Sequence, residues 1–285
     1  MYRNALFFAA LAASAVPALA QPTDAAPPAS TNLPDPNDRS DTLTIGVGGA
    51  LVPDYEGSND YRITPAAAVR GRYHGISFAT RGTSLAVNVV PRGSGKISLS
   101  AGPIAGLRFN RSGDIKDAVV KLLPERKRAI ELGGFVGMSA RGLTNPYDSL
   151  GLRVEVVHDV GNAHKSTIIS PAVDFSTPLS RTTFVGVSAG LDIVQKRYSD
   201  AYFAVSPADA SLSGLPVFAG KGGLKDWKVN LIALQSLSGS LLHGWAIAGT
   251  VGYSQLQGDF KRSPIVSQRG KAGQWLAAAG LAYTF

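Results

Sequence analysis

Four histidines are the first residues to test for chemistry, and they are His74, His158, His164 and His243. A nucleophilic triad holds a serine, a histidine and a carboxylate in contact, and His158 precedes Asp159. Successive residues of a strand point to opposite faces, so Asp159 cannot easily orient the His158 ring. We therefore interpret His158 as a histidine at the rim of the fold and predict no catalytic residues and no enzymatic activity.

Metal, phosphate and cofactor sites have no better support. The chain contains no cysteine, and no two histidines have the spacing of a ligand pair. The segment VPDYEGSND offers the oxygens of Asp54, Glu56 and Asp60 to a calcium ion, but it fits no defined calcium loop. Residues 57–60 are better interpreted as a turn. The glycines of GVGGA precede no helix and cannot cradle a phosphate. We predict no metal and no cofactor.

Seven charged residues lie within segments that are otherwise apolar or rich in small residues. They are Arg108, Glu131, Arg153, Glu155, Asp174, Asp192 and Lys228. Charges of both signs can pair across neighbouring strands, or they can line the lumen of a barrel. A selective pore lining and a set of stabilising ion pairs are both open interpretations at this point.

The segments that carry these charges have the period of β-strands. From Thr42 onward apolar residues recur at every second position, with one shift of parity predicted at Pro103. The last segment, WLAAAGLAYTF, ends on Phe285 and alternates strictly from Trp275 to Tyr283. Strict alternation that ends on a C-terminal aromatic residue is typical of a bacterial outer-membrane β-barrel.

Counting these segments predicts about twelve strands. They cover residues 42–51, 61–70, 72–80, 83–90, 96–109, 128–140, 149–159, 165–176, 182–193, 224–236, 243–254 and 273–285. The even-numbered connections, around Gly71, PRGSG, GLTNPYDS, TPLS and SLSGS, are short. The long connections are all odd-numbered: VPDYEGSND, 110–127, 194–223 and LQGDFKRSPIVSQRGKAG. RGT and VGNAHK are short odd connections, so ten strands are an alternative.

We therefore predict an all-β, antiparallel transmembrane β-barrel with short periplasmic turns and longer external loops. Trp245 and Tyr253, like Trp275 and Tyr283, are eight positions apart, which is about 26 Å along a strand and about 20 Å after tilting. This spacing favours two aromatic girdles that flank an apolar band. A soluble β-sandwich also has alternating strands and is the competing fold.

The N-terminal region predicts export. Residues 1–20 have Arg3, a short apolar run and a small-x-small ending at Ala18 and Ala20, as in a signal peptide. Residues 21–41 are rich in proline and polar residues and are interpreted as a flexible periplasmic tether. Residues 42–285 form the predicted barrel, and the location is the outer membrane.

The net charge of +8 bears on partners. It suits contact with outer-membrane lipid and with lipopolysaccharide phosphates, or it is carried by solvated loops without a specific role. An exported chain with no long run of basic residues is not predicted to bind nucleic acid.

Two of the long connections have features of their own. In residues 114–126, Ile115, Val119 and Leu122 have helical spacing, which predicts a short amphipathic helix at the mouth or on the rim. Residues 194–223 combine aromatic and turn residues, and a loop of this length is usually functional or folded inward.

These loops resemble the MipA/OmpV family of outer-membrane proteins, whose archetype is an MltA-interacting scaffolding protein. The resemblance extends over GVGGALVPDYEGSNDYRITP, AIELGGFVG, RYSDAYFAVSPADASLSGL, GDFKRSPIV and the terminal GLAYTF. The residues at family-motif positions are Pro53, Tyr55, Glu56, Gly57, Ser58, Tyr198, Tyr202, Phe203, Ser263 and Pro264. Ala204 departs from the motif, where a glycine is expected.

The resemblance implies a non-enzymatic barrel that acts as an envelope scaffold. The archetype is thought to bring a murein transglycosylase and a murein synthase together, which makes these enzymes candidate partners linked to peptidoglycan. Other members resemble adhesins or envelope-stress and permeability factors. A narrow diffusion channel is the alternative that the charged lumen predicts.

Overall fold

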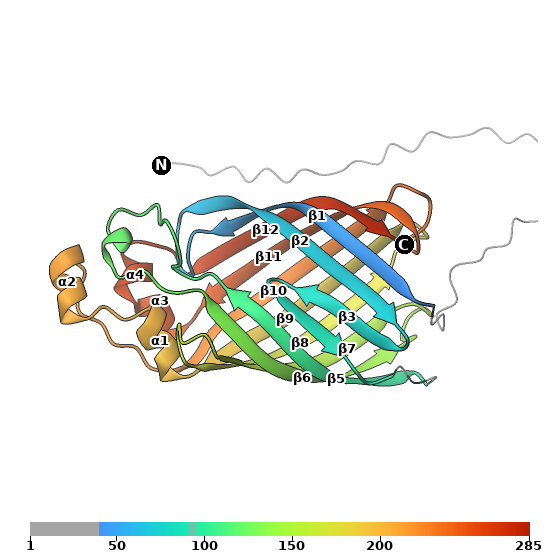
Figure 1. Cartoon of the computed structure of the whole chain (residues 1–285), viewed down its shortest axis with the longest axis horizontal. Coiled ribbons are helices and arrows are strands. Elements are labelled where there is room, and N and C mark those ends of the chain that lie inside the picture. The colour runs from blue at the N-terminus through green and yellow to red at the C-terminus, as the bar shows by residue number, and fades with distance from the viewer. Residues whose placement is uncertain (1–39, 92, 94) are drawn as a thin grey trace, which may run out of the picture. The chain divides into compact units, whose positions relative to one another are not determined.

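The computed structural model describes residues 40–91, 93 and 95–285, and these form a closed antiparallel barrel of twelve strands (Figure 1). The strands are β1 (Thr42–Pro53), β2 (Tyr61–Tyr73), β3 (Ile76–Arg81), β4 (Ser84–Asn88), β5 (Ile97–Arg108), β6 (Ala129–Arg141), β7 (Ser149–Asp159), β8 (Thr167–Pro178), β9 (Thr183–Val194), β10 (Gly223–Ser236), β11 (Gly244–Leu256) and β12 (Gly273–Thr284). The prediction of about twelve strands is confirmed. The expected leader, 1–20, and nearly all of the expected tether, 21–41, lie outside the described residues.

The first and last strands close the barrel. Each strand pairs with its chain neighbours, and β1 pairs with β12 from Thr44↔Thr284 to Leu51↔Ala277. The N–H of Phe285 donates to the carbonyl of Leu43 (2.9 Å). The terminal aromatic strand therefore removes the free edges that an open sheet would have.

Alternating side chains give the wall two different faces. On β7, Leu150, Leu152, Val154 and Val156 are exposed, whereas the residues between them are less exposed. Large apolar side chains face outward on the other long strands as well, as a lipid-facing surface requires. The opposite parity faces the barrel interior.

The aromatic residues expected to form girdles meet in pairs across β11 and β12. Trp245 lies opposite Tyr283, with ring centroids 5.1 Å apart, and Tyr253 lies opposite Trp275 at 4.9 Å. The first pair lies at the short-turn end and the second at the long-loop end. This arrangement supports the prediction of two girdles.

Two local predictions were wrong. The turn placed at Gly71 lies at His74 and Gly75, whose φ angles of 49° and 83° suit the paired left-handed positions of a tight hairpin. The parity shift expected at Pro103 is absent, because β5 pairs with β6 in one continuous register. Ile104 is instead buried on the interior face, where it contributes to a small cluster with Ala86 and Phe135.

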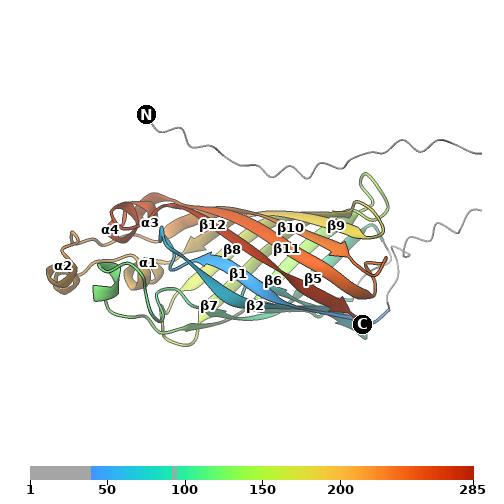
Figure 2. The same ribbon diagram turned by 90° about the horizontal axis from the view of Figure 1, so that it is seen from above.

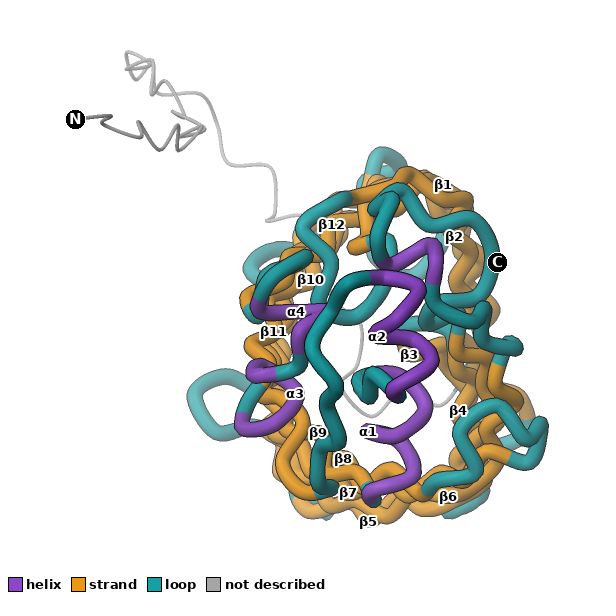
Figure 3. Tube along the Cα trace, turned by 90° about the vertical axis from the view of Figure 1, so that its left-hand side faces the viewer, coloured by secondary structure: helices purple, strands orange, loops and turns teal. Residues whose placement is uncertain are grey.

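Connections of unequal length separate the two ends of the barrel. Figure 2 shows helices gathered at one end and the C-terminus at the other. The helices are α1 (Lys196–Tyr202), α2 (Pro207–Ser213), α3 (Gly258–Arg262) and α4 (Pro264–Ser267), with a 3-10 turn η1 at Val120–Leu122. In Figure 3, α1 and α2 lie across the opening that the strands frame. We call this end the mouth.

The loops at the mouth differ from their sequence predictions in one respect. The prediction of an amphipathic helix at 114–126 is wrong, because only the single turn η1 forms there and Leu122 is 53% exposed. The Asp117 carboxylate caps the start of the turn, because it accepts from the N–H groups of Val119 and Val120 (2.9 and 2.8 Å), so Ile115 lies before the turn. The turn ends at Leu123, which is extended and precedes Pro124. In the connection over 194–223, α1 folds inward with Tyr198 and Tyr202 buried, whereas α2 has no buried residue and projects from the mouth (Figure 1).

The mouth loops have a hydrophobic core of their own. One cluster joins Tyr55, Ile115, Val120, Leu123, Val205, Leu215 and Ile265. A second joins residues of α1 and α3 to the upper barrel wall. Among the described residues no helix is long and apolar enough to cross a bilayer.

Candidate functional site

Three loops that are far apart in the chain meet at the mouth, and they are the loops that carry the family motif. Tyr55, Ser58, Tyr198, Tyr202, Phe203, Ser263 and Pro264 are buried there. The hydroxyl of Ser263 donates to the carbonyl of Phe203 (2.6 Å). Gly57 has φ +98°, and a Cβ on it would lie 2.4 Å from Cγ2 of Val266. The Ser263 bond joins the segment before α4 to the residue after α1, and Gly57 packs the loop after Pro53, the last residue of β1, against α4.

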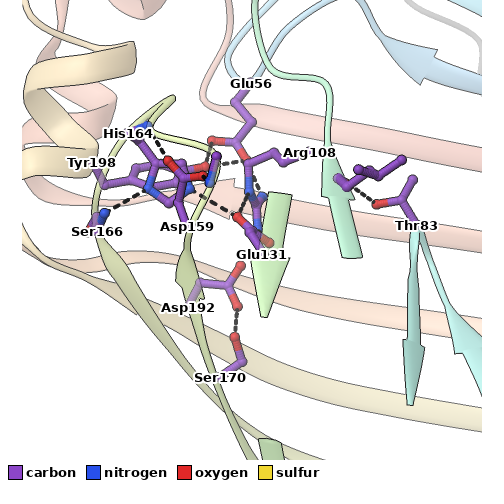
Figure 4. Close-up of polar contacts among 12 residues, drawn as sticks. Glu56, Thr83, Arg108, Glu131, Asp159, His164, Ser166, Ser170, Asp192 and Tyr198 are labelled. Atoms are coloured by element: carbon purple, nitrogen blue, oxygen red, sulfur yellow. Dashed lines mark hydrogen bonds and ion pairs between the residues drawn. The ribbon is translucent and has the colours of Figure 1, made fainter. Parts of the chain in front are cut away.

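Glu56 is the centre of the polar contacts under this cover (Figure 4). Its Oε1 lies 3.1 Å from Arg108 Nη1 and 3.1 Å from Lys225 Nζ. The hydroxyl of Tyr198 donates to both carboxylate oxygens, at 2.9 and 2.8 Å. Because Arg108 belongs to β5 and Lys225 to β10, a single loop carboxylate links two separated parts of the barrel wall.

These contacts set the ionisation of Glu56 and Tyr198. Burial alone would raise the pKa of Glu56, but Lys225, Arg108 and the Tyr198 hydroxyl outweigh it and lower the pKa below its ordinary value. Burial, with the nearby Glu56 charge, raises the pKa of Tyr198. Glu56 is therefore a carboxylate at neutral pH, and Tyr198 is a neutral hydrogen-bond donor to it.

Arg108 extends the cluster to β6 and to a buried histidine. Its Nε and Nη2 bind the two oxygens of Glu131, at 2.6 and 3.2 Å. His164 Nε2 lies 3.1 Å from Glu131 Oε1, and its Nδ1 accepts from the N–H of Ser166 at 3.2 Å. Because Nδ1 is an acceptor, the ring proton lies on Nε2 and is donated to Glu131.

A β-bulge on β10 supplies the other side of the cluster. The register with β9 shifts between Leu224 and Asp226, so Lys225 and Asp226 both point inward, at 2% and 6% exposure. Lys225 Nζ lies 3.3 Å from Asp192 and 3.2 Å from Asp226. Asp192 also binds Lys228 (2.6 Å). One buried ammonium group thus serves three carboxylates.

A second ionic layer lies nearer the short-turn end. Arg81 of β3 binds Glu155 of β7 (2.5 Å), and its guanidinium lies 4.8 Å from the ring centre of Phe135. Glu155 also accepts from Arg153 (2.8 Å), and Arg153 pairs with Asp174. The Arg81–Glu155 contact crosses the lumen, because three strands lie between β3 and β7 in the wall.

A polar cavity of about 170 Å³ adjoins this second layer. Its lining includes Arg81, Arg153 and Asp174, together with Ser100, Ser139 and Ser176. Hydroxyl groups and charges of both signs could hold a small polar solute there.

All seven charged residues expected in the lumen lie on the interior parity. The structure divides them into Arg108, Glu131, Asp192 and Lys228 in the mouth layer, and Arg153, Glu155 and Asp174 in the second layer. Their role as a pore lining stays a prediction. Sequence reasoning missed Glu56, Lys225, His164 and Arg81 as interior groups. The one signal for Glu56 was its place in the family-motif loop.

The histidine chemistry considered from the sequence does not assemble. His158 Nδ1 lies 3.0 Å from the Thr167 hydroxyl, whereas Asp159 accepts from the backbone N–H groups of Gly161, His164 and Lys165. Within the described part of the chain, no group of three or more His, Asp or Glu side chains could hold a metal ion. The arrangement instead has a structural capacity: its ion pairs attach the mouth loops to the barrel wall.

Fold and site together define a transmembrane β-barrel of outer-membrane type whose mouth is held by a buried ionic cluster. The chain belongs to the MipA family, because the family model described as MltA-interacting protein MipA matches residues 45–285. The family resemblance inferred from the loops is confirmed. No curated protein matches the chain.

Several solved barrels are similar at low identity. The NanC porin is 11% identical, with 85% of this chain and 98% of that chain covered and a TM-score of 0.47. The COG4313 outer membrane channel from Pseudomonas putida F1 is 10% identical, with 92% and 100% covered and a TM-score of 0.45. OmpT of Vibrio cholerae is 8% identical, with 87% and 99% covered and a TM-score of 0.37.

Proposed function

We propose that this protein is a non-enzymatic outer-membrane scaffold that contacts murein-degrading and murein-synthesising enzymes in the periplasm. The observation that carries the proposal is the Glu56 cluster, in which side chains from β5, β10 and α1 meet across the lumen under the mouth loops. A barrel fastened in this way is suited to presenting a rigid surface. The family name, MltA-interacting protein, supports a murein transglycosylase as one partner.

The surface available for such partners is the short-turn end. Three of its turns each expose a leucine: Leu143 (53%), Leu179 (65%) and Leu237 (58%). Exposed large apolar residues that recur at one end of a molecule are candidates for protein contact. A partner that covers several turns at once would use all three.

The test compares two triple variants in intact envelopes. Leu143→Ser with Leu179→Ser and Leu237→Ser removes the apolar side chains of the turns. The matched control replaces three exposed residues of the mouth loops, Leu122→Ser, Leu212→Ser and Val217→Ser. After crosslinking, we expect the turn variant to lose murein transglycosylases and synthases and the control to keep them. Equal recovery from both variants would remove the short-turn end from the proposal.

The tether predicted at 21–41 is a separate candidate surface. Deleting residues 22–40 tests it by the same crosslinking assay. Recovery of murein enzymes at the wild-type level would exclude the tether as their binding segment.

A narrow diffusion channel is a second candidate, and the 170 Å³ polar cavity favours it. In planar bilayers it predicts discrete conductance steps, with a charge preference altered by Arg153→Ala or Glu155→Ala. Glu56→Gln, which weakens the fastening of the mouth, should raise the frequency of opening. The absence of conductance steps with both the wild type and Glu56→Gln would reject the channel.

A further inference from the structure

Among the described residues, the barrel wall is incomplete on the mouth side of the short β3–β4 hairpin. β2 pairs with β1 along its whole length, from Thr42↔Arg72 to Pro53↔Tyr61. With β3 it pairs only from Arg70↔Ala79 to Tyr73↔Ile76. Residues 61–69 of β2 therefore have an edge without a partner strand. Figure 1 shows β2 continuing toward the mouth past the end of β3.

The hydrogen-bonding groups of this edge are only partly satisfied. The Thr80 hydroxyl contacts the N–H and the carbonyl of Val69. The backbone N–H and carbonyl groups of the odd-numbered residues of β2 therefore point toward this edge. Lys116 Nζ donates to the carbonyl of Tyr61 (2.5 Å), and Pro65 has no N–H to satisfy. Within the described part of the chain, the edge groups of Ile63 and Ala67 have no hydrogen-bond partner.

This edge lies at membrane depth. The Tyr61 hydroxyl accepts from the N–H of Trp275 (3.0 Å), so Tyr61 is level with the mouth-side pair Trp275 and Tyr253. Ile63 and Ala67 lie further toward the bilayer centre, and Ile63 is 82% exposed. Unpaired backbone groups in the hydrocarbon layer are tolerated only where they are buried in protein or line a water-filled space. Ile63 and Ala67 are both exposed, so protein does not bury this edge. The edge therefore marks an opening in the wall.

The interior wall behind the edge is lined by small residues and ends at a cation. The interior-facing residues of β1, β2 and β12 here are Gly46, Gly48, Ala50, Ala66, Ala68, Ala278 and Gly280. Gly48 and Ala68 are exposed to the interior. Arg70 follows on the same face of β2, is exposed, and has no acidic partner among the described residues. Most of the paired interior charges lie on the opposite wall, from β5 to β10.

We propose that the β2 edge is a lateral opening that binds a long-chain carboxylate, such as a fatty acid, between the outer leaflet and the lumen. The carboxylate binds Arg70 and the free edge N–H of Ala67, three residues away on the same strand, and the chain passes between Ile63 and the hairpin into the bilayer. One cation next to an apolar passage is the complement of a single-chain anionic amphiphile. This site is independent of the periplasmic contacts proposed above.

Spin-labelled stearic acid tests the site, with the full-length mature protein in zwitterionic phosphatidylcholine vesicles. The measured quantity is the saturable, immobilised fraction of the probe. We expect Ala68→Trp, which fills the opening from the inside, and Arg70→Gln each to abolish this fraction. The methyl ester of the same probe, which lacks the charge, should show no saturable binding to the wild-type protein.

Two control variants separate the site from the general lipid surface. Ala279→Trp adds the same bulk on the outer face of β12, and Arg181→Gln removes an exposed cation from a turn. Heat-modifiable migration on gels verifies that each variant is folded. Saturable binding lost in the two site variants and kept in the controls supports the opening. No saturable binding to the wild type, or equal effects in site and control variants, overturns it.

Discussion

The two ionic layers of the barrel interior differ in burial, and this difference shows what each can contribute. In the mouth layer Lys225, Glu131 and Asp192 have side chains that are 3%, 5% and 7% exposed. Glu56 and Arg108 of the same layer are each 24% exposed. In the second layer no side chain is as buried as Lys225: Glu155, Arg153, Arg81 and Asp174 are 19%, 21%, 34% and 39% exposed. Both layers join distant strands, yet only in the mouth layer would a lost partner leave charges that water cannot reach. The mouth layer therefore holds the mouth loops to the barrel wall, and the second layer is closer to a hydrated lining of the lumen.

The largest effect is expected from Lys225→Ala. This change leaves Glu56, Asp192 and Asp226 without the ammonium group that all three share, and removing one partner of a buried ion pair costs about 3–5 kcal/mol. The measurement is the free energy of unfolding in urea in the presence of lipid vesicles. The control is Lys196→Ala, whose pair with Asp200 is largely exposed, with an expected loss of about 0.5 kcal/mol or less. Equal losses would mean that burial makes the ion pairs of Lys225 no stronger than an exposed pair.

Gly57→Ala tests whether backbone geometry holds Glu56 in the mouth layer. The new Cβ would overlap Cγ2 of Val266 at 2.4 Å, and φ is +98°. Backbone strain and overlap together should cost about 2–4 kcal/mol. Gly214→Ala is the matched control, because it has φ +72° with nothing within 4 Å of the Cβ. Its unfolding free energy should fall by about 1 kcal/mol, from backbone strain alone. A loss as small at Gly57 would mean that the loop yields to the methyl group.

The sequence predicts the barrel well because each strand repeats one local rule. The two-residue alternation of a strand can be recognised from neighbouring residues alone. The sequence therefore predicts the twelve strands and the inward orientation of Arg153 and Asp192. The mouth layer violates that rule at two places. Lys225 faces inward because a bulge puts it next to Asp226 on one face, and Glu56 belongs to a loop, where parity has no meaning.

Contacts across the lumen are beyond the reach of sequence pattern for a different reason. Arg81 and Glu155 meet because the barrel closes, and strand alternation does not specify which strands face one another. The expected helix at 114–126 failed for a local reason, because the Asp117 carboxylate caps a turn that starts after Ile115, and the turn ends at Leu123, which is extended before Pro124. Of the connection 194–223, only α1 folds inward, and its buried aromatic side chains account for this.

Acid should weaken the mouth layer through Glu56. Its pKa is lowered in the folded protein, so its charge stabilises the fold fully above the ordinary value of 4.5, and this contribution is lost as the pH falls through the lowered value. Glu56→Gln should therefore reduce the unfolding free energy at neutral pH, and the difference from the wild type should shrink as the pH falls below 4.5. Urea unfolding at a series of pH values measures it. A difference that stays constant with pH would show that the carboxylate charge is not what fastens the loop.

The smallest effect is expected from Arg81→Ala in the second layer. Water in the lumen reaches this guanidinium, so its pair with Glu155 should contribute about 1 kcal/mol or less, although the contact is short. A double-mutant cycle with Glu155→Ala isolates the pair from the packing of Arg81 on Phe135. A coupling energy as large as the loss in Lys225→Ala would mean that the second layer is shielded from water. The barrel would then be closed at two levels, which would favour the scaffold over the channel.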